Sequence, residues 1–124
     1  MRGLLAVVLA ISIGGCAGQS VDTSARVNHW VGVLGGPDAK LRKEAAFKLG
    51  NLGLSDPATV VPALTGALKD VDAGVRRESI LALMKCGTRA REATPVLTEM
   101  EQRDPDGQVR HYATKALQKL RNER

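Results

Sequence analysis

Aromatic residues are rare in this sequence, and their scarcity limits the kind of core that the chain can form. Trp30, Phe47 and Tyr112 are the only three, 2% of 124 residues. The interior must therefore be built from Leu, Val, Ala and Ile, which close-packed helices use more than β-sandwiches do. The sequence predicts an all-α fold of one domain.

Histidine and cysteine are also rare, with two residues of each. His29 and His111 are too far apart in the chain to suggest a shared site. The sequence shows no Ser-His-Asp order, Gly-rich phosphate loop or Cys-x-x-Cys pair, and a metal site needs clustered ligands. We therefore expect no enzymatic activity, no metal and no cofactor.

The chain also lacks a block of charge of one sign. It has 18 Lys and Arg against 13 Asp and Glu, a formal net charge of +5, but the signs alternate along the sequence. This pattern is typical of a solvated surface. Attraction to an anionic lipid or a cell-envelope polymer is the alternative interpretation.

The start of the chain, from Met1 to Cys16, has the organisation of an export signal. Arg2 precedes an apolar stretch from Leu4 to Ile13, about half of the roughly 20 residues that span a bilayer. The next segment, Ile13-Gly14-Gly15-Cys16, resembles the lipobox of bacterial lipoproteins, in which a branched residue and two small residues precede the acylated cysteine. The resemblance implies a signal peptide over residues 1–15, then a Cys16 carrying acyl chains such as palmitate and a short tether, together residues 16–20.

The same resemblance implies attachment to the bacterial cell envelope. Ala17 after the cysteine favours the periplasmic face of the outer membrane over the inner membrane, where the retention signal is typically Asp. The alternative is ordinary cleavage after Ala17 or Gly18, which would release a soluble periplasmic or secreted protein without Cys16.

An internal repeat organises the rest of the chain. Asp38, Asp72 and Asp106 stand 34 positions apart, and each precedes apolar or small residues at helical spacing. The matched positions are Leu41, Val75 and Val109; Ala45, Ser79 and Ala113; Leu49, Leu83 and Leu117; and Leu52, Cys86 and Leu120. We predict three Asp-capped helices, the first two ending at Gly53 and Gly87 with positive φ. Cys86, at a leucine position, should be a small buried side chain.

A second helix lies between the Asp-capped helices. Residues 62–68 match residues 28–34 one period earlier, and residues 95–98 match one position short of a full period, a slip that falls in the loop after Gly87. Pro62 and Pro95 fit the first turn of these intervening helices. In the last Asp-capped helix, polar residues replace the small or apolar ones of earlier repeats, as the soluble end of a stack requires. These polar residues are Thr114, Lys115 and Gln118.

Together these features resemble the HEAT family, most closely the short subtype first associated with phycobilisome lyases. The matching motifs are Pro62-Ala63-Leu64, Asp70-Val71-Asp72, Val75-Arg76 and Ala45-Ala46, and the resemblance covers residues 24–121. It implies a short α-solenoid of antiparallel helix pairs over residues 21–124, with about two full repeats and flanking half repeats.

Acidic and basic residues recur at fixed positions of the repeat. The resemblance implies that they join neighbouring loops and helices through charge-assisted hydrogen bonds, and a charged binding surface is the alternative. The set is Asp38, Arg42, Asp70, Asp72, Arg76, Asp104, Asp106 and Arg110.

The outward positions of the intervening helices are the candidate protein-binding residues, because small side chains there leave room for an inserted segment. They are His29, Val31, Gly32, Ala63, Thr65, Gly66, Thr98, Glu99 and Gln102. We predict a membrane-anchored, non-catalytic protein-interaction module or scaffold that binds unidentified proteins and neither nucleic acid nor a small-molecule substrate. The alternatives are a structural envelope protein that binds an anionic surface or polymer and, less favoured, a lyase-like enzyme.

Overall fold

The computed structural model describes residues 22–123, and over this range the chain is a stack of helices without a strand. The predicted signal peptide (1–15), the lipidation site Cys16 and the tether (16–20) lie outside the described residues. The helices are residues 22–34, α2 (Ala39–Leu52), α3 (Pro57–Ala67), α4 (Ala73–Lys85), the 3-10 helix η1 (Gly87–Ala93), α5 (Thr94–Arg103) and α6 (Gly107–Asn122). The predicted short, all-α HEAT-like solenoid is confirmed.

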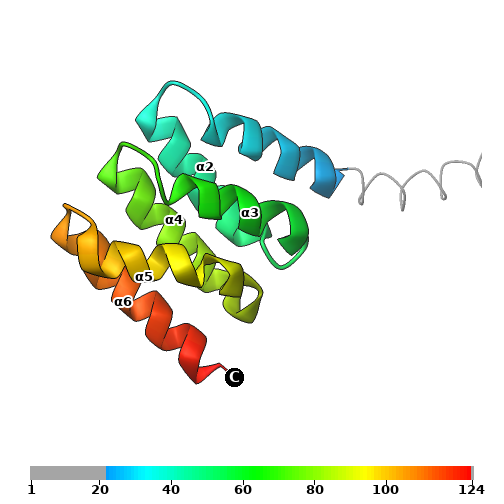
Figure 1. Ribbon diagram of the computed structural model, residues 1–124. Helices are drawn as coiled ribbons and strands as arrows, with labels where there is room; N and C mark the ends of the chain where they lie inside the picture. The colour runs from blue at the N-terminus through cyan, green and yellow to red at the C-terminus, as the bar shows by residue number, and fades with distance from the viewer. Residues whose placement is uncertain (1–21, 124) are drawn as a thin grey trace, which may run out of the picture.

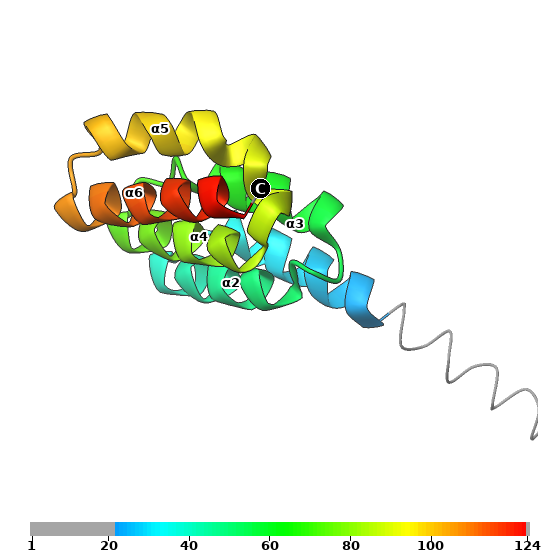
Figure 2. The same cartoon turned by 90° about the horizontal axis from the view of Figure 1, so that it is seen from below.

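The helices form two layers (Figures 1 and 2). The A layer contains α2, α4 and α6, each of which begins after one of the repeated aspartates, and each packs on the next. The B layer contains helix 22–34, α3 and α5; α3 packs on α2 and α4, and α5 packs on α6. None of the described helices is long and apolar enough to cross a bilayer.

Small residues let the A-layer helices approach one another closely. Ala45, Ser79 and Ala113 share one repeat position, and all three are fully buried. The Ser79 hydroxyl donates a hydrogen bond to the Val75 carbonyl oxygen (2.8 Å), so its burial leaves no unpaired donor. The core is therefore continuous from α2 through α4 to α6, as the periodicity of the sequence predicts.

The prediction of a positive φ at Gly53 is wrong, whereas Gly87 has the expected φ of +61°. Gly53 follows α2 with φ −61° and ψ −30°, so its backbone is right-handed. A Cβ at Gly53 would lie 2.3 Å from the Cys86 Sγ. Close approach of the end of α4, and not backbone conformation, therefore explains this glycine.

The prediction that Pro62 lies in the first turn is also wrong, because α3 begins earlier, at Pro57. Asp56 caps this start by accepting a hydrogen bond from the Thr59 backbone N–H (3.2 Å). Pro62 lies inside the helix, where its ring nitrogen cannot bond to the Ala58 carbonyl oxygen. Ala58 and Pro62 are both exposed, so water can donate a hydrogen bond to the Ala58 carbonyl oxygen. Pro95 lies in the first turn of α5, as expected.

The one-residue slip after Gly87 coincides with η1 instead of an irregular loop. η1 packs against α3, α4, α5 and α6, and it buries Ala90 and Ala93. At the end of the stack, Lys115 and Gln118 of α6 are exposed and Thr114 is half-buried, whereas the equivalent Ala46 and Gly50 of α2 are buried. Thr114 and Gln118 therefore face the open end of the stack, whereas Lys115 occupies the position of Phe47, which is itself 44% exposed.

Candidate protein-binding surface on the B layer

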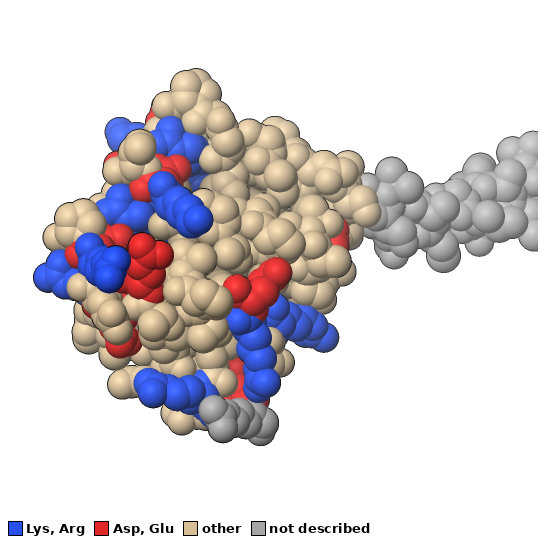
Figure 3. Space-filling model, in the orientation of Figure 1, with Lys and Arg blue, Asp and Glu red and all other residues tan. Residues whose placement is uncertain are grey.

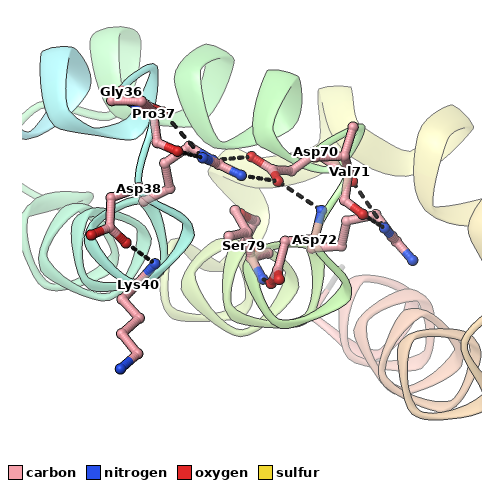
Figure 4. A network of polar contacts seen from close by, with 11 residues as sticks. Gly36, Pro37, Asp38, Lys40, Asp70, Val71, Asp72 and Ser79 are labelled. Atoms are coloured by element: carbon pink, nitrogen blue, oxygen red, sulfur yellow. Dashed lines mark hydrogen bonds and ion pairs between the residues drawn. The ribbon is translucent and has the colours of Figure 1, made fainter.

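Two arginines join neighbouring repeats at the loop edge of the stack, and Figure 4 shows the polar contacts around Asp70, to which the first of them binds. Arg42 of α2 donates to both carboxylate oxygens of Asp70 (2.8 and 3.0 Å), and Arg76 of α4 does the same to Asp104 (2.9 and 3.0 Å). Each guanidinium also donates to two backbone carbonyls of the loop before its own helix. One arginine therefore fixes its own loop and the loop of the following repeat.

The repeated arginines and aspartates together form what we call the ladder, in which the aspartates also bind backbone N–H groups. Asp70 and Asp104 each accept a hydrogen bond from the backbone N–H two residues on, at 2.9 Å. Asp72 and Asp106 cap α4 and α6 by accepting from the N–H three residues on (3.0 and 2.9 Å). Asp38 caps α2 by accepting from the N–H two residues on (2.8 Å). Each aspartate therefore stabilises a loop or a helix start.

The ladder shifts the ionisation of Asp70. Burial alone would raise its pKa, but hydrogen bonds from Arg42 and from the Asp72 N–H, with the charges of Arg42 and Arg76, hold that pKa below its usual value.

The last step of the ladder is incomplete, since Arg110 is exposed and donates to the Asp104 backbone oxygen (2.6 Å). Arg42 and Arg76 are only 12% exposed, so these two guanidinium groups serve the fold and present little surface to a partner.

None of the nine candidate binding residues is buried. Val31, Ala63 and Thr65 are half-buried and the other six are exposed. The hydroxyls of Thr65 and Thr98 donate to backbone carbonyls four residues earlier in their own helices (both 2.8 Å). These two threonines therefore offer a partner a methyl group and an acceptor more readily than a donor.

Three of the candidates come together in a shallow groove between helix 22–34 and α3. The groove has a volume of about 360 Å³. Its lining consists of Val31, Leu34, Gly35, Ala63, Gly66, Ala67, Lys69 and Asp70. Most of these residues are small and apolar. The two charged residues, Lys69 and Asp70, are neighbours in the loop after α3.

Gly32 and Gly66 occupy equivalent positions of the B layer, and neither is required by the fold. A Cβ at either position would meet no atom within 4 Å, and neither residue has a positive φ. Glycine inside a helix is less stable than alanine by roughly 0.5–1 kcal/mol. Both residues expose helix backbone at the surface, where another chain could approach closely.

A second groove of about 410 Å³ follows along the B layer between the end of α3 and α5. Of the nine candidates only Glu99 lines it, while Thr98 lines a third groove of about 380 Å³ between α5 and the end of α6. His29, Gly32, Thr65 and Gln102 line none of these grooves. The nine residues therefore do not form one continuous site.

Sequence reasoning missed Lys69 and Asp70 as groove residues, although both line the first and the second groove. They lie after the end of α3, where helical periodicity gives no information about neighbours. Met100 and Arg103 of α5 were missed as well, because helical spacing alone does not show where α5 approaches the end of α3.

The other chemistry-bearing residues do not form a reactive cluster. Among residues 22–123, no three His, Cys, Asp or Glu side chains lie close enough together to hold a metal ion. His29 packs edge-on against Trp30 with ring centroids 4.9 Å apart. Cys86 is 1% exposed, as predicted from its repeat position, and burial raises the pKa of its thiol.

The geometry agrees with the comparison to known families. A family model described as HEAT repeats matches residues 27–118. No curated protein and no solved structure matches the chain. The matched range includes most of the residues of both layers. The chain therefore belongs to the HEAT-repeat family.

Proposed function

We propose that this protein is a membrane-anchored bacterial lipoprotein whose B layer binds an extended segment of another protein, as a scaffold and without catalysing a reaction. The observation that carries the binding proposal is the groove between helix 22–34 and α3, with exposed helix backbone at Gly32 and Gly66 nearby. HEAT repeats commonly serve as protein-interaction modules, because stacked repeats make extended surfaces.

The anchor is proposed from the sequence. Ile13-Gly14-Gly15-Cys16 has the lipobox pattern, and two or more acyl chains on Cys16 would make attachment stable. Ala17 supports the periplasmic face of the outer membrane as the location. The motifs around Pro62 and Asp70 support assignment of the repeats to the short phycobilisome-lyase-like subtype, without the lyase activity.

The binding proposal is tested by photo-cross-linking in the native envelope. A photoreactive residue at position 63, inside the groove, should trap a partner. A second at position 118, an exposed position of α6 at the open end of the stack, serves as the control. Adding Gly66→Arg should abolish the cross-link from position 63 because the new side chain fills the groove. A cross-link that persists in this variant, or one of equal yield from position 118, would contradict the proposal.

The anchor is tested separately by intact-mass analysis of the membrane fraction. The mature protein should begin at Cys16 and carry acyl chains, and Cys16→Ala should be unacylated. A wild-type chain cleaved after Ala17 or Gly18 and recovered in the soluble fraction would contradict the anchor without affecting the groove.

A further inference from the structure

Charge is segregated between the two layers, although the signs alternate along the sequence. α2, α4 and α6 carry four, three and four Lys or Arg and only two acidic residues in total. The B layer is nearly neutral, and α3 has no charged residue at all. Figure 3, in the orientation of Figure 1, accordingly shows uncharged surface over helix 22–34 and α3, whereas charged side chains line the loop edge at the left and also lie lower down, in the region of η1 and α5.

Five of the A-layer cations form what we call the basic face: Lys40, Lys43, Arg77, Lys85 and Lys115. Of these five, Lys40, Lys43, Lys85 and Lys115 are exposed and Arg77 is half-buried. Two glutamates, Glu44 and Glu78, are the acidic residues of the A-layer helices. The basic face therefore has an excess of positive charge that faces solvent.

The cations of the basic face lack acidic partners. Within residues 22–123 the ion pairs are Arg42–Asp70, Arg76–Asp104 and Lys119–Glu123, none of which involves the basic face. The Lys85 ammonium lies 4.4 Å from the ring centre of Phe47 and donates to the Asn51 Oδ1 (3.0 Å). Arg77 donates to the Gln108 Oε1 on α6. These groups remain available to external anions.

Apolar side chains lie among these cations. Phe47 is 44% exposed and Leu81, its equivalent in α4, is half-buried. Mixed basic and apolar surface is typical of proteins that rest on the headgroup region of a membrane, where cations meet phosphates and an aromatic ring meets the acyl boundary. A soluble polyanion would use the cations but would gain little from Phe47.

The position at which helix 22–34 begins also favours a membrane as the binding partner of the basic face. Helix 22–34 begins at the level of α2 and away from α5 (Figure 2). Asp22 comes only six positions after Cys16, and a chain of that length spans at most about 20 Å. An acyl group on Cys16, on which this step rests, would hold the A layer close to the bilayer and raise its effective concentration there.

We propose that the basic face docks on the anionic headgroups of phospholipids, with the B layer and its grooves turned away from the membrane toward protein partners. The anchor then supplies attachment and the basic face supplies orientation. Each Lys or Arg near an anionic membrane contributes roughly a fivefold gain in binding. Docking should therefore be strong on anionic vesicles, weak on neutral ones, and reversed by salt.

The test uses the full acylated protein on vesicles of phosphatidylcholine, with or without one-third phosphatidylglycerol. A polarity-sensitive fluorophore is placed at Gln108→Cys, beside Arg77, or at the matched exposed position Gln102→Cys on α5. Cys86 is buried and stays in place. Only the probe at position 108 should move to an apolar environment, and only on anionic vesicles.

Charge variants complete the test. Lys43→Gln with Arg77→Gln should lower the ratio of docked to undocked protein about 25-fold, whereas Lys69→Gln with Arg103→Gln, on the groove side, should not change it. Equal responses from both probes, no effect of the first pair, or a response to heparin without one to vesicles would overturn the proposal. Retention on neutral vesicles reports the anchor alone, so failure of the anchor and failure of docking are distinguishable.

Discussion

Substituting alanine for single glycines separates those that the fold requires from those that it does not. Gly66 is near the end of α3 with open space around the position of a Cβ, so Gly66→Ala should stabilise the domain by about 0.5–1 kcal/mol. Gly32→Ala should act in the same direction. For a domain of this size the gain corresponds to a rise in Tm of roughly 2–8 °C.

Gly50→Ala is the matched control, because Gly50 is also helical but lies against α4. Its Cβ would be 2.8 Å from the Ala82 Cβ and 2.9 Å from the Ala82 Cα, and the backbone contact cannot be relieved by a rotamer change. Overpacking of this kind costs roughly 1–3 kcal/mol, more than the propensity gain. Gly50→Ala should therefore lower the free energy of unfolding.

Both effects are measured by urea unfolding followed by circular dichroism of the helical signal. If the B layer binds a chain that approaches its backbone, Gly66→Ala should also weaken partner cross-linking while it stabilises the fold. A destabilising Gly66→Ala would refute the reasoning, since it would show that this glycine serves the folded chain itself.

Three further predictions concern the ladder and the buried thiol. Arg76→Met should cost about 2–4 kcal/mol in urea unfolding because it leaves the Asp104 carboxylate unpaired, whereas Arg110→Met, which lacks such a partner, should cost less than about 1 kcal/mol; equal losses would contradict this. The lowered pKa of Asp70 means that its stabilisation is complete above the pKa of an unfolded Asp, about 3.9, and is lost as pH falls through the folded value. In acid titration, Asp70→Asn should therefore remove part of the loss of stability below about pH 4, and an unchanged acid transition would argue against it. Cys86 should resist a thiol reagent at mildly alkaline pH until denaturant unfolds the chain, as read by peptide mass, and rapid labelling of the native protein would contradict its burial.

The helical order of the chain was predictable because it rests on residues that act locally and repeat. Each repeated aspartate caps its helix through its own side chain, as Asp72 does for α4. The apolar stripe after it faces the core, except that Leu41 in the first repeat is 50% exposed and Leu120 in the last is half-buried, so the prediction was wrong for Leu41. Such contacts depend on near neighbours and on stacking, both of which the sequence period shows directly.

The errors arose where two helices from different repeats meet. A positive φ was predicted for Gly53 because glycine often ends helices in that conformation. The residue is glycine because a Cβ there would collide with the Cys86 Sγ at the end of α4, in the next repeat. The start of α3 was taken from Pro62, whereas Asp56-Pro57 combines an N-cap with a first-turn proline and was the better signal. The grooves could not be predicted, since their shape depends on how far apart the B-layer helices lie.

The distribution of charge shows why alternation along a repeat sequence does not imply a mixed surface. In a solenoid of fixed period, one repeat position falls on one face in every repeat, so any residue preference at that position becomes a stripe. Lys43 and Arg77 share one such position, and their equivalent is His111. Acidic residues of the repeat fall mainly at the loop positions of the ladder, where Asp70 and Asp104 are neutralised by arginines. These two aspartates of the ladder are thus paired with arginines, whereas the cations of the basic face have no acidic partner among residues 22–123. A sequence in which the signs of charge alternate therefore folds into a neutral groove face on the B layer and a basic face on the A layer.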